Sequence, residues 1–105
     1  MPSSPALTRL QEWYIAHCNG DWEHTWGIKI DTLDNPGWRV RIDLWETELE
    51  NVAFEPVKIA YEHPTNWVTC VVKDGQFHGN CGPSKLEQVL EIFLEWAGKN
   101  KPAVT

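Results

Sequence analysis

The chain has 105 residues and a net charge of −6, from nine Lys and Arg against fifteen Asp and Glu. This length fits one domain, and a composition of 42% apolar and 23% charged residues is ordinary for a globular protein. The composition excludes a disordered tail, a collagen-like repeat and a disulfide-rich scaffold, and no apolar run reaches the roughly 20 residues of a membrane helix. Because nucleic acid needs a basic footprint, we expect neither nucleic acid nor a membrane as a partner.

Cysteine usage indicates a reducing compartment. The three cysteines, Cys18, Cys70 and Cys81, are odd in number and form no C-x-x-C pair, which argues against a zinc ribbon or a secreted disulfide framework. The first five residues carry neither the basic nor the apolar region of a signal peptide. We therefore expect a cytoplasmic protein in which the thiols are small buried side chains.

The first predicted element is a helix. Apolar residues recur there at helical spacing: Leu7, Leu10, Tyr14 and Cys18. Ser4 is a suitable N-cap, Pro5 suits the first helical position, and Asn19-Gly20 is suited to end the helix. The charged face of this helix is thin, so we expect it to pack against a sheet.

A long hairpin follows. Residues 22–33 alternate between apolar and polar, which predicts one half-buried strand with Glu23 and Asp31 on its polar face. Asp34-Asn35-Pro36-Gly37 is dense in turn residues, and residues 38–44 then alternate again. The sequence therefore predicts two paired strands with one apolar face and one charged face.

The remaining elements are predicted from shorter signals. Residues 46–51 are an acidic connection, and Asp74-Gly75 is a two-residue hairpin signal between strands at 67–73 and 76–80. A third strand is expected over 52–61, with a bulge or an edge at Pro56. Ser84 and Glu87 have the spacing of a capping box for a final helix that ends near Gly98.

These elements predict one α+β domain over residues 1–105, with frayed tails at 1–4 and 99–105. The strands follow one another with short links, so the expected sheet has about five mainly antiparallel strands. An N-terminal and a C-terminal helix would flank it and cover its apolar face. The charged face would meet solvent or a partner.

Catalytic motifs are weak in this chain. Asp21, Glu23 and His24 could move protons or bind a metal, but on a strand Glu23 and His24 point to opposite faces. No cysteine is flanked by the basic residues that would activate a nucleophile. We expect no catalytic site, no metal and no cofactor. Two alternatives stay open: a small enzyme using Asp21, Glu23, His24 and Cys18, and a small-molecule-binding module whose concave sheet face is lined by tryptophans.

The charge is concentrated in one stretch. Residues 43–62 contain six acidic residues and one base, Lys58. Trp45 is out of phase with the strand that precedes it and sits at the entry to this stretch. A tryptophan rimmed by carboxylates is typical of a protein-binding surface; the alternatives are a solvated loop and a tryptophan that folds back into the core.

Several segments resemble the immunity protein 53 family. The longest is Cys18-Asn19-Gly20-Asp21-Trp22-Glu23-His24, followed by Gly27-Ile28-Lys29-Ile30 and Thr32-Leu33-Asp34-Asn35-Pro36-Gly37-Trp38; the stretches 10–14 and 86–96 fit as well. The resemblance covers nearly the whole chain, with residues 45–82 less distinct. It implies the antidote half of a bacterial polymorphic toxin system, a protein that binds and blocks a cognate toxin such as a nuclease.

The resemblance transfers a class of function and no catalytic residues. We interpret most of the shared motif as structural: Asp21, Trp22, His24, Asp34, Asn35, Pro36, Gly37 and Trp38. For the toxin-binding surface we predict Asp43, Trp45, Glu46, Glu48 and Glu50, with Asp31 and Glu23 as second choices. An acidic inhibitor suits a basic toxin through electrostatic steering. The sequence names neither the toxin nor the oligomeric state.

Overall fold

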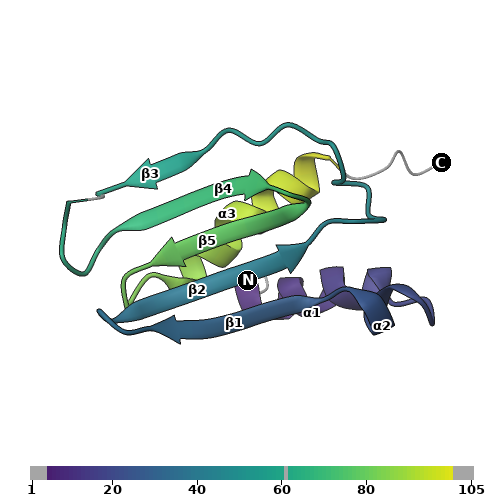
Figure 1. Cartoon of the computed structure of the whole chain (residues 1–105), viewed down its shortest axis with the longest axis horizontal. Coiled ribbons are helices and arrows are strands. Elements are labelled where there is room, and N and C mark those ends of the chain that lie inside the picture. Colours follow the sequence, from purple (N-terminus) through teal and green to yellow (C-terminus); the bar gives the residue numbers. More distant parts are fainter. Residues whose placement is uncertain (1–4, 61, 101–105) are drawn as a thin grey trace.

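The computed structural model describes residues 5–60 and 62–100. Its elements, in chain order, are α1 (Ala6–His17), α2 (Trp22–Thr25), β1 (Ile28–Leu33), β2 (Gly37–Asp43), β3 (Val57–Ile59), β4 (Val68–Lys73), β5 (Gln76–Cys81) and α3 (Leu86–Lys99) (Figure 1). The five strands form one sheet in the order β1-β2-β5-β4-β3, and all neighbours are antiparallel. The predicted α+β class, with a helix at each end of the chain, is confirmed.

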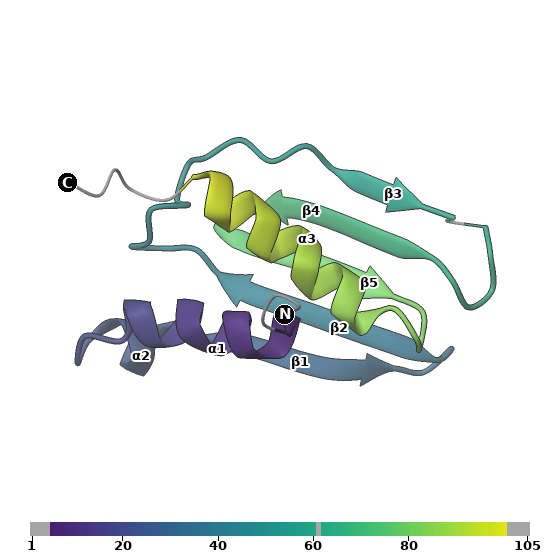
Figure 2. The ribbon, with the colours of Figure 1, turned by 180° about the vertical axis from the view of Figure 1, so that it is seen from behind.

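Both long helices lie on the same face of the sheet (Figure 2). The alternation of β2 turns Val40 and Ile42, each 0% exposed, toward them, while Phe77 of β5 and Phe93 of α3 meet between the layers at 5.2 Å. Arg39 and Arg41 project from the other face, which none of the helices in the described part of the chain covers. The apolar and charged faces of the β1–β2 hairpin are therefore those that its sequence predicts.

Residues 22–26 do not join the first strand, and this part of the prediction is wrong. Trp22–Thr25 is a single helical turn, and β1 begins only at Ile28. The Asn19 side chain accepts the N–H groups of Asp21 and Trp22, both at 2.9 Å. Such local bonds compete with a strand ladder. As a result Trp22 is turned inward and is 2% exposed.

The third strand is shorter than predicted. Only Val57–Ile59 pairs with β4, whereas the sequence suggested a strand over 52–61. Pro56 has no N–H to donate and stands just before the paired residues. Phe54 packs its ring edge-on against Phe77 and Trp96, at 5.6 and 5.0 Å, so this stretch is held by side-chain packing. The predicted end at Tyr61 lies outside the described residues.

The helix ends differ in detail from the predicted caps. Pro5 occupies the N-cap of α1 while the proposed Ser4 cap lies outside the described residues, and α1 ends at a Cys18 C-cap. Lys85, not Ser84, precedes α3, no side chain caps that helix, and it runs through Gly98 to Lys99. Residue 99 is thus helical rather than part of a tail; residues 1–4 and 101–105 lie outside the described ranges. Within those ranges no helix has the length and apolarity needed to cross a membrane.

Candidate functional site: an acidic end and an apolar groove

Two separate segments, 18–27 and 43–51, meet at one end of the molecule. The Trp22 indole N–H donates to the Trp45 carbonyl at 2.9 Å. Gly27 donates its N–H to the Asp43 carboxylate at 2.9 Å, and its carbonyl accepts the Asp43 N–H at 3.0 Å. We call these two segments together the acidic end.

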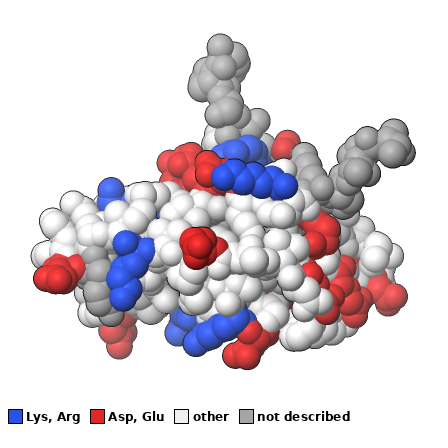
Figure 3. All heavy atoms as spheres, turned by 90° about the horizontal axis from the view of Figure 1, so that it is seen from above, with Lys and Arg blue, Asp and Glu red and all other residues white. Residues whose placement is uncertain are grey.

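The acidic end carries six carboxylates and no Lys or Arg: Asp21, Glu23, Asp43, Glu46, Glu48 and Glu50. Figure 3 shows acidic side chains gathered at the right-hand end of the molecule, where in Figure 1 β2 ends and α2 lies, with no blue side chain among them. The acidic character of residues 43–51 was predicted from the sequence. The fold brings residues 18–27 next to them, which the sequence did not predict.

Two of the predicted interface carboxylates hold the fold together. Asp43 accepts the Gly27 N–H through one oxygen and the Gln76 side-chain amide, at 2.7 Å, through the other. Glu48 is 2.7 Å from His17 Nε2, and Nδ1 of the same ring is 2.7 Å from the Trp13 carbonyl. Both ring nitrogens of His17 therefore have a hydrogen-bond partner. The His17–Glu48 pair therefore fixes the acidic end to α1.

Trp45 is held in place while part of its ring remains exposed. Its side chain is 37% exposed, and its ring lies 6.2 Å from that of Trp26. On the other side it contacts the Asp74-Gly75 turn so closely that a Cβ at Gly75 would come within 2.1 Å of the ring. A rigid, partly exposed indole of this kind is suited to anchor a protein interface, because little conformational entropy is lost when a partner covers it.

Glu46 and Glu50 contact each other within the acidic end. The Glu50 carboxylate accepts the Glu46 N–H at 3.0 Å, and Glu46 adopts a φ of +65°. This left-handed conformation is unfavourable for a residue with a Cβ. The Glu46 side chain itself is exposed, so its charge is available to a partner.

Replacement of Glu46 by glycine is expected to stabilise the protein by about 0.5–1 kcal/mol. Relief of the left-handed backbone outweighs the extra freedom that glycine gives the unfolded chain. Urea denaturation followed by circular dichroism would measure the change. Asn51, whose φ is +70°, is the matched control: asparagine tolerates this region, so Asn51→Gly should gain less. A destabilised Glu46→Gly protein would contradict the expected strain.

The two second-choice residues lie in different places. Glu23 belongs to the acidic end on the short helix α2, not to the polar face of a strand as predicted. Its carboxylate accepts the N–H groups of Asn19 and Gly20 at 2.9 and 2.8 Å. Hydrogen bonds from its own N–H and from these two lower the pKa of Glu23. Asp31 lies in the middle of β1 opposite Arg39, outside both segments; its two hydrogen bonds from Arg39 lower the pKa of Asp31.

The family-motif residues divide into buried and exposed groups. Trp22 is buried, and a Cβ at Gly37 would lie 2.3 Å from the Cys81 carbonyl oxygen, so the β2–β5 approach needs glycine there. The Trp38 indole donates to the Pro83 carbonyl at 2.9 Å. Residues 34–36 form the turn between β1 and β2. Asp21 and His24 are exposed. The packing, hydrogen bonds and turn described above therefore support a structural role for Trp22, residues 34–37 and Trp38, but not for these two.

Two residues of the alternative catalytic site, Glu23 and Cys18, bond to backbone groups, while the other two, Asp21 and His24, are exposed. Glu23 is bonded as described, and the Cys18 thiol donates to the Tyr14 carbonyl at 3.2 Å. Burial raises the pKa of Cys70 to about 12 and also raises that of Cys81. These two thiols are the small buried side chains that we predicted, whereas for Cys18 that prediction is wrong, since it is only partly buried. Across residues 5–60 and 62–100 no three His, Cys, Asp or Glu side chains gather in a way that could hold a metal ion.

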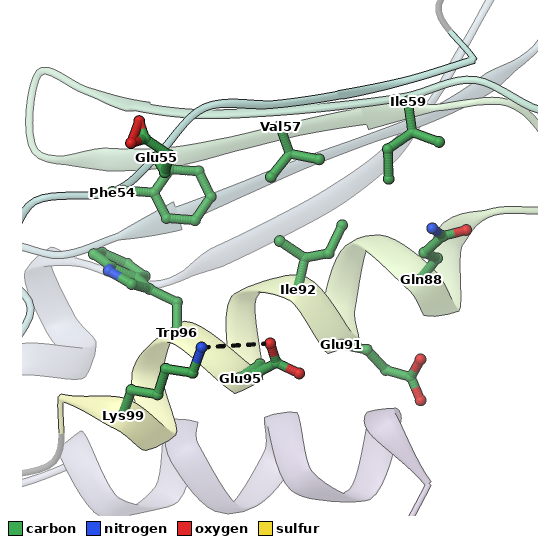
Figure 4. A pocket seen from close by; sticks show the side chains of 10 residues that line it. All are labelled: Phe54, Glu55, Val57, Ile59, Gln88, Glu91, Ile92, Glu95, Trp96 and Lys99. Atoms are coloured by element: carbon green, nitrogen blue, oxygen red, sulfur yellow. Dashed lines mark ion pairs between the residues drawn. The ribbon is translucent and has the colours of Figure 1, made fainter.

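An apolar groove runs between residues 54–59 and α3, with a volume of about 520 Å³. Figure 4 shows its walls: Phe54, Val57 and Ile59 on one side and Ile92 and Trp96 on the other, with Glu55, Gln88, Glu91 and the Glu95–Lys99 pair around them. The sequence did not predict this groove, because its walls, residues 54–59 and α3, are far apart in the chain. A second hollow of about 650 Å³ lies on the uncovered sheet face beside Arg39, Arg41 and Trp67. Both are open to solvent rather than enclosed like a small-molecule site.

The fold and these surfaces define a small α+β protein with one helix-covered sheet face, an acidic aromatic end and an open apolar groove. A family model described as Immunity protein 53 matches residues 7–98, and the chain belongs to this family. The resemblance that we drew from the sequence is thereby confirmed, and with it an immunity-protein role. No curated protein and no solved structure matches the chain.

Proposed function

We propose that this protein neutralises a cognate bacterial toxin by covering it with the acidic end, without catalysis, cofactor or metal. The observation that supports this proposal most directly is that two segments distant in sequence, 18–27 and 43–51, form one surface with six carboxylates and no Lys or Arg. Trp45 supplies an aromatic anchor within it. The partner best matched to this surface is a basic toxin such as a nuclease, encountered in the cytoplasm.

Electrostatics and packing have separate parts in this proposal. Exposed carboxylates speed the encounter with a basic surface and give it a strong salt dependence. The indole of Trp45 would contribute mostly to the dissociation rate, because a buried aromatic anchor must leave its pocket before the complex separates. Asp43 and Glu48 contribute indirectly, since their oxygens already bind Gly27, Gln76 and His17.

The test begins by identifying the toxin through affinity capture from the native bacterium and mass spectrometry. Affinity is then measured for Trp45→Ala, Glu46→Lys and Glu50→Gln, the last keeping an acceptor for the Glu46 N–H. We expect Glu46→Lys to weaken binding by about tenfold, chiefly in the association rate at low salt, and Trp45→Ala by about thirtyfold in the dissociation rate.

Glu87→Lys is the matched control, because it makes the same charge change at an exposed position in the first turn of α3. It should bind the toxin nearly as well as the parent protein. Equal affinity of Glu46→Lys and Trp45→Ala to the parent would place the interface elsewhere. If cells that produce the toxin gain no protection from the parent protein, neutralisation itself is ruled out.

A further inference from the structure

The strand β1 forms an open edge of the sheet. Among the strands of residues 5–60 and 62–100 its one neighbour is β2, and its four central residues, 29–32, are exposed. In Figure 1 none of these strands lies beyond it. An uncovered edge of this length presents unpaired backbone groups that another strand can bind.

The hydrogen bonds between β1 and β2 show which backbone groups of β1 point away from the sheet. The bond from the Asp43 N–H to the Gly27 carbonyl makes 27 and 43 a hydrogen-bonded pair. Because such pairs alternate along an antiparallel ladder, Lys29 and Asp31 bond to β2. The backbone N–H and C=O groups of Ile28, Ile30 and Thr32 therefore point away from the sheet.

The side chains of this edge are complementary to themselves. Suppose that two copies pair antiparallel around Ile30: each Ile30 then faces its mate, and Ile28 faces Thr32. In that register Lys29 of each copy stands directly opposite Asp31 of the other. In the same register, residues 28, 30 and 32, whose backbone groups point away from the sheet, would exchange hydrogen bonds with the other copy. The register that pairs opposite charges is therefore also the one that pairs the free backbone groups.

The surroundings of the edge support a protein contact. Ile30 is 37% exposed on the helix-covered side of the sheet, and α1 runs along β1 on that side (Figure 2). α1 leaves Leu7 58% and Ile15 66% exposed, a large apolar area for a free surface. On the opposite face Asp31 accepts two hydrogen bonds from Arg39 and shares its side of the strand with Lys29, two residues away.

We propose that two copies of this chain associate through β1, joining their sheets into one continuous antiparallel sheet across a two-fold axis at Ile30. The interface is isologous, so it closes as a dimer and does not propagate. It lies on a different part of the chain from the acidic end. The dimer does not depend on the toxin-binding proposal, and it would leave one acidic end free on each copy.

Charge-swapped variants test this register. Lys29→Glu places two carboxylates opposite each other at both symmetric positions, and Asp31→Lys does the same with two cations. Analytical ultracentrifugation of the full chain at 0.15 M salt should show the parent as a dimer and each variant with a dissociation constant at least about tenfold higher. An equimolar mixture of the two variants restores opposite charges at both positions, so it should dimerise like the parent.

Lys73→Glu, an equal charge change at an exposed position of β4, is the control and should leave the dimer intact. Amide hydrogen exchange gives a second measurement: protection of Ile28, Ile30 and Thr32 should rise with protein concentration, while Lys29 and Asp31 stay protected throughout. The proposal is overturned if the parent protein stays monomeric up to concentrations on the order of 100 micromolar. It is also overturned if Lys29→Glu leaves the dimer unchanged. Protection of the outward amides only when toxin is added would overturn it as well, since a toxin strand would then occupy the edge.

Discussion

Replacement of Trp22 by alanine is expected to lower the free energy of unfolding by about 3–5 kcal/mol, a large part of the stability of a domain of this size. The indole is 2% exposed and packs against the rings of Trp13, Tyr14 and His17, at 6.0, 5.9 and 5.8 Å. Trp13 in turn contacts Phe93 at 5.1 Å, so the cavity would open beside the main core. Urea denaturation followed by far-ultraviolet circular dichroism measures the loss.

The same change should disturb the acidic end, because the Trp22 indole N–H holds the Trp45 carbonyl. Trp22→Phe isolates this contribution, since it keeps an aromatic ring but removes the donor. We expect that variant to stay folded and to show faster amide exchange in residues 44–50 than the parent. Trp38→Phe is the control: it also loses an indole-to-carbonyl bond, to Pro83, but far from residues 44–50. Unchanged exchange in Trp22→Phe would mean that Trp45 is positioned by other contacts.

Replacement of Gly82 by alanine is expected to destabilise the protein by about 3 kcal/mol. A Cβ at this position would lie 1.8 Å from the Thr65 carbonyl oxygen and 2.5 Å from its carbon. Both are backbone atoms, so no side-chain rotation relieves the overlap and the chain near Thr65 must move. That movement also weakens the hydrogen bond from the Gly82 N–H to the Trp67 carbonyl.

Thermal unfolding of Gly82→Ala should therefore occur well below that of the parent protein, by about 12 °C or more. Two glycines with no atom within 4 Å of an added Cβ provide controls, Gly27 and Gly98. Gly98 lies inside α3, so Gly98→Ala should raise stability by up to about 1 kcal/mol. If Gly82→Ala unfolded at the parental temperature, the contact between residues 65 and 82 would not be as close as described.

The fold class and the two faces of the central hairpin could be predicted from the sequence, because they follow from strict alternation. Val40 and Ile42 enter the core and Arg39 and Arg41 do not, as period two requires. The Asp74-Gly75 turn was equally predictable from its turn residues, and it occurs where expected with φ of +54° and +74°. Each of these features depends on residues close together in the chain.

The predicted strands over residues 22–26 and 52–56 are wrong because local polar bonds, or packing against distant residues, decide the conformation there. Trp22, His24 and Trp26 alternate like a strand, yet Asn19 and Glu23 bind the backbone of their own loop and form a helical turn instead. Phe54 is held by Phe77 and Trp96, neither of which is near it in sequence. The groove between β3 and α3 follows from that packing, so no local sequence pattern predicted it.

The candidate site shows the same division. The sequence by itself determined that residues 43–50 are acidic and that Trp45 breaks the strand phase, because charge and periodicity are local properties. Only the tertiary structure decided that residues 18–27 join them, that Asp43 and Glu48 are committed to structural bonds, and that Lys29 and Asp31 share an open edge. The physical reason is that hydrogen bonds and side-chain contacts between segments distant in sequence, such as Trp22 with Trp45 and His17 with Glu48, form only when the sheet and helices have packed.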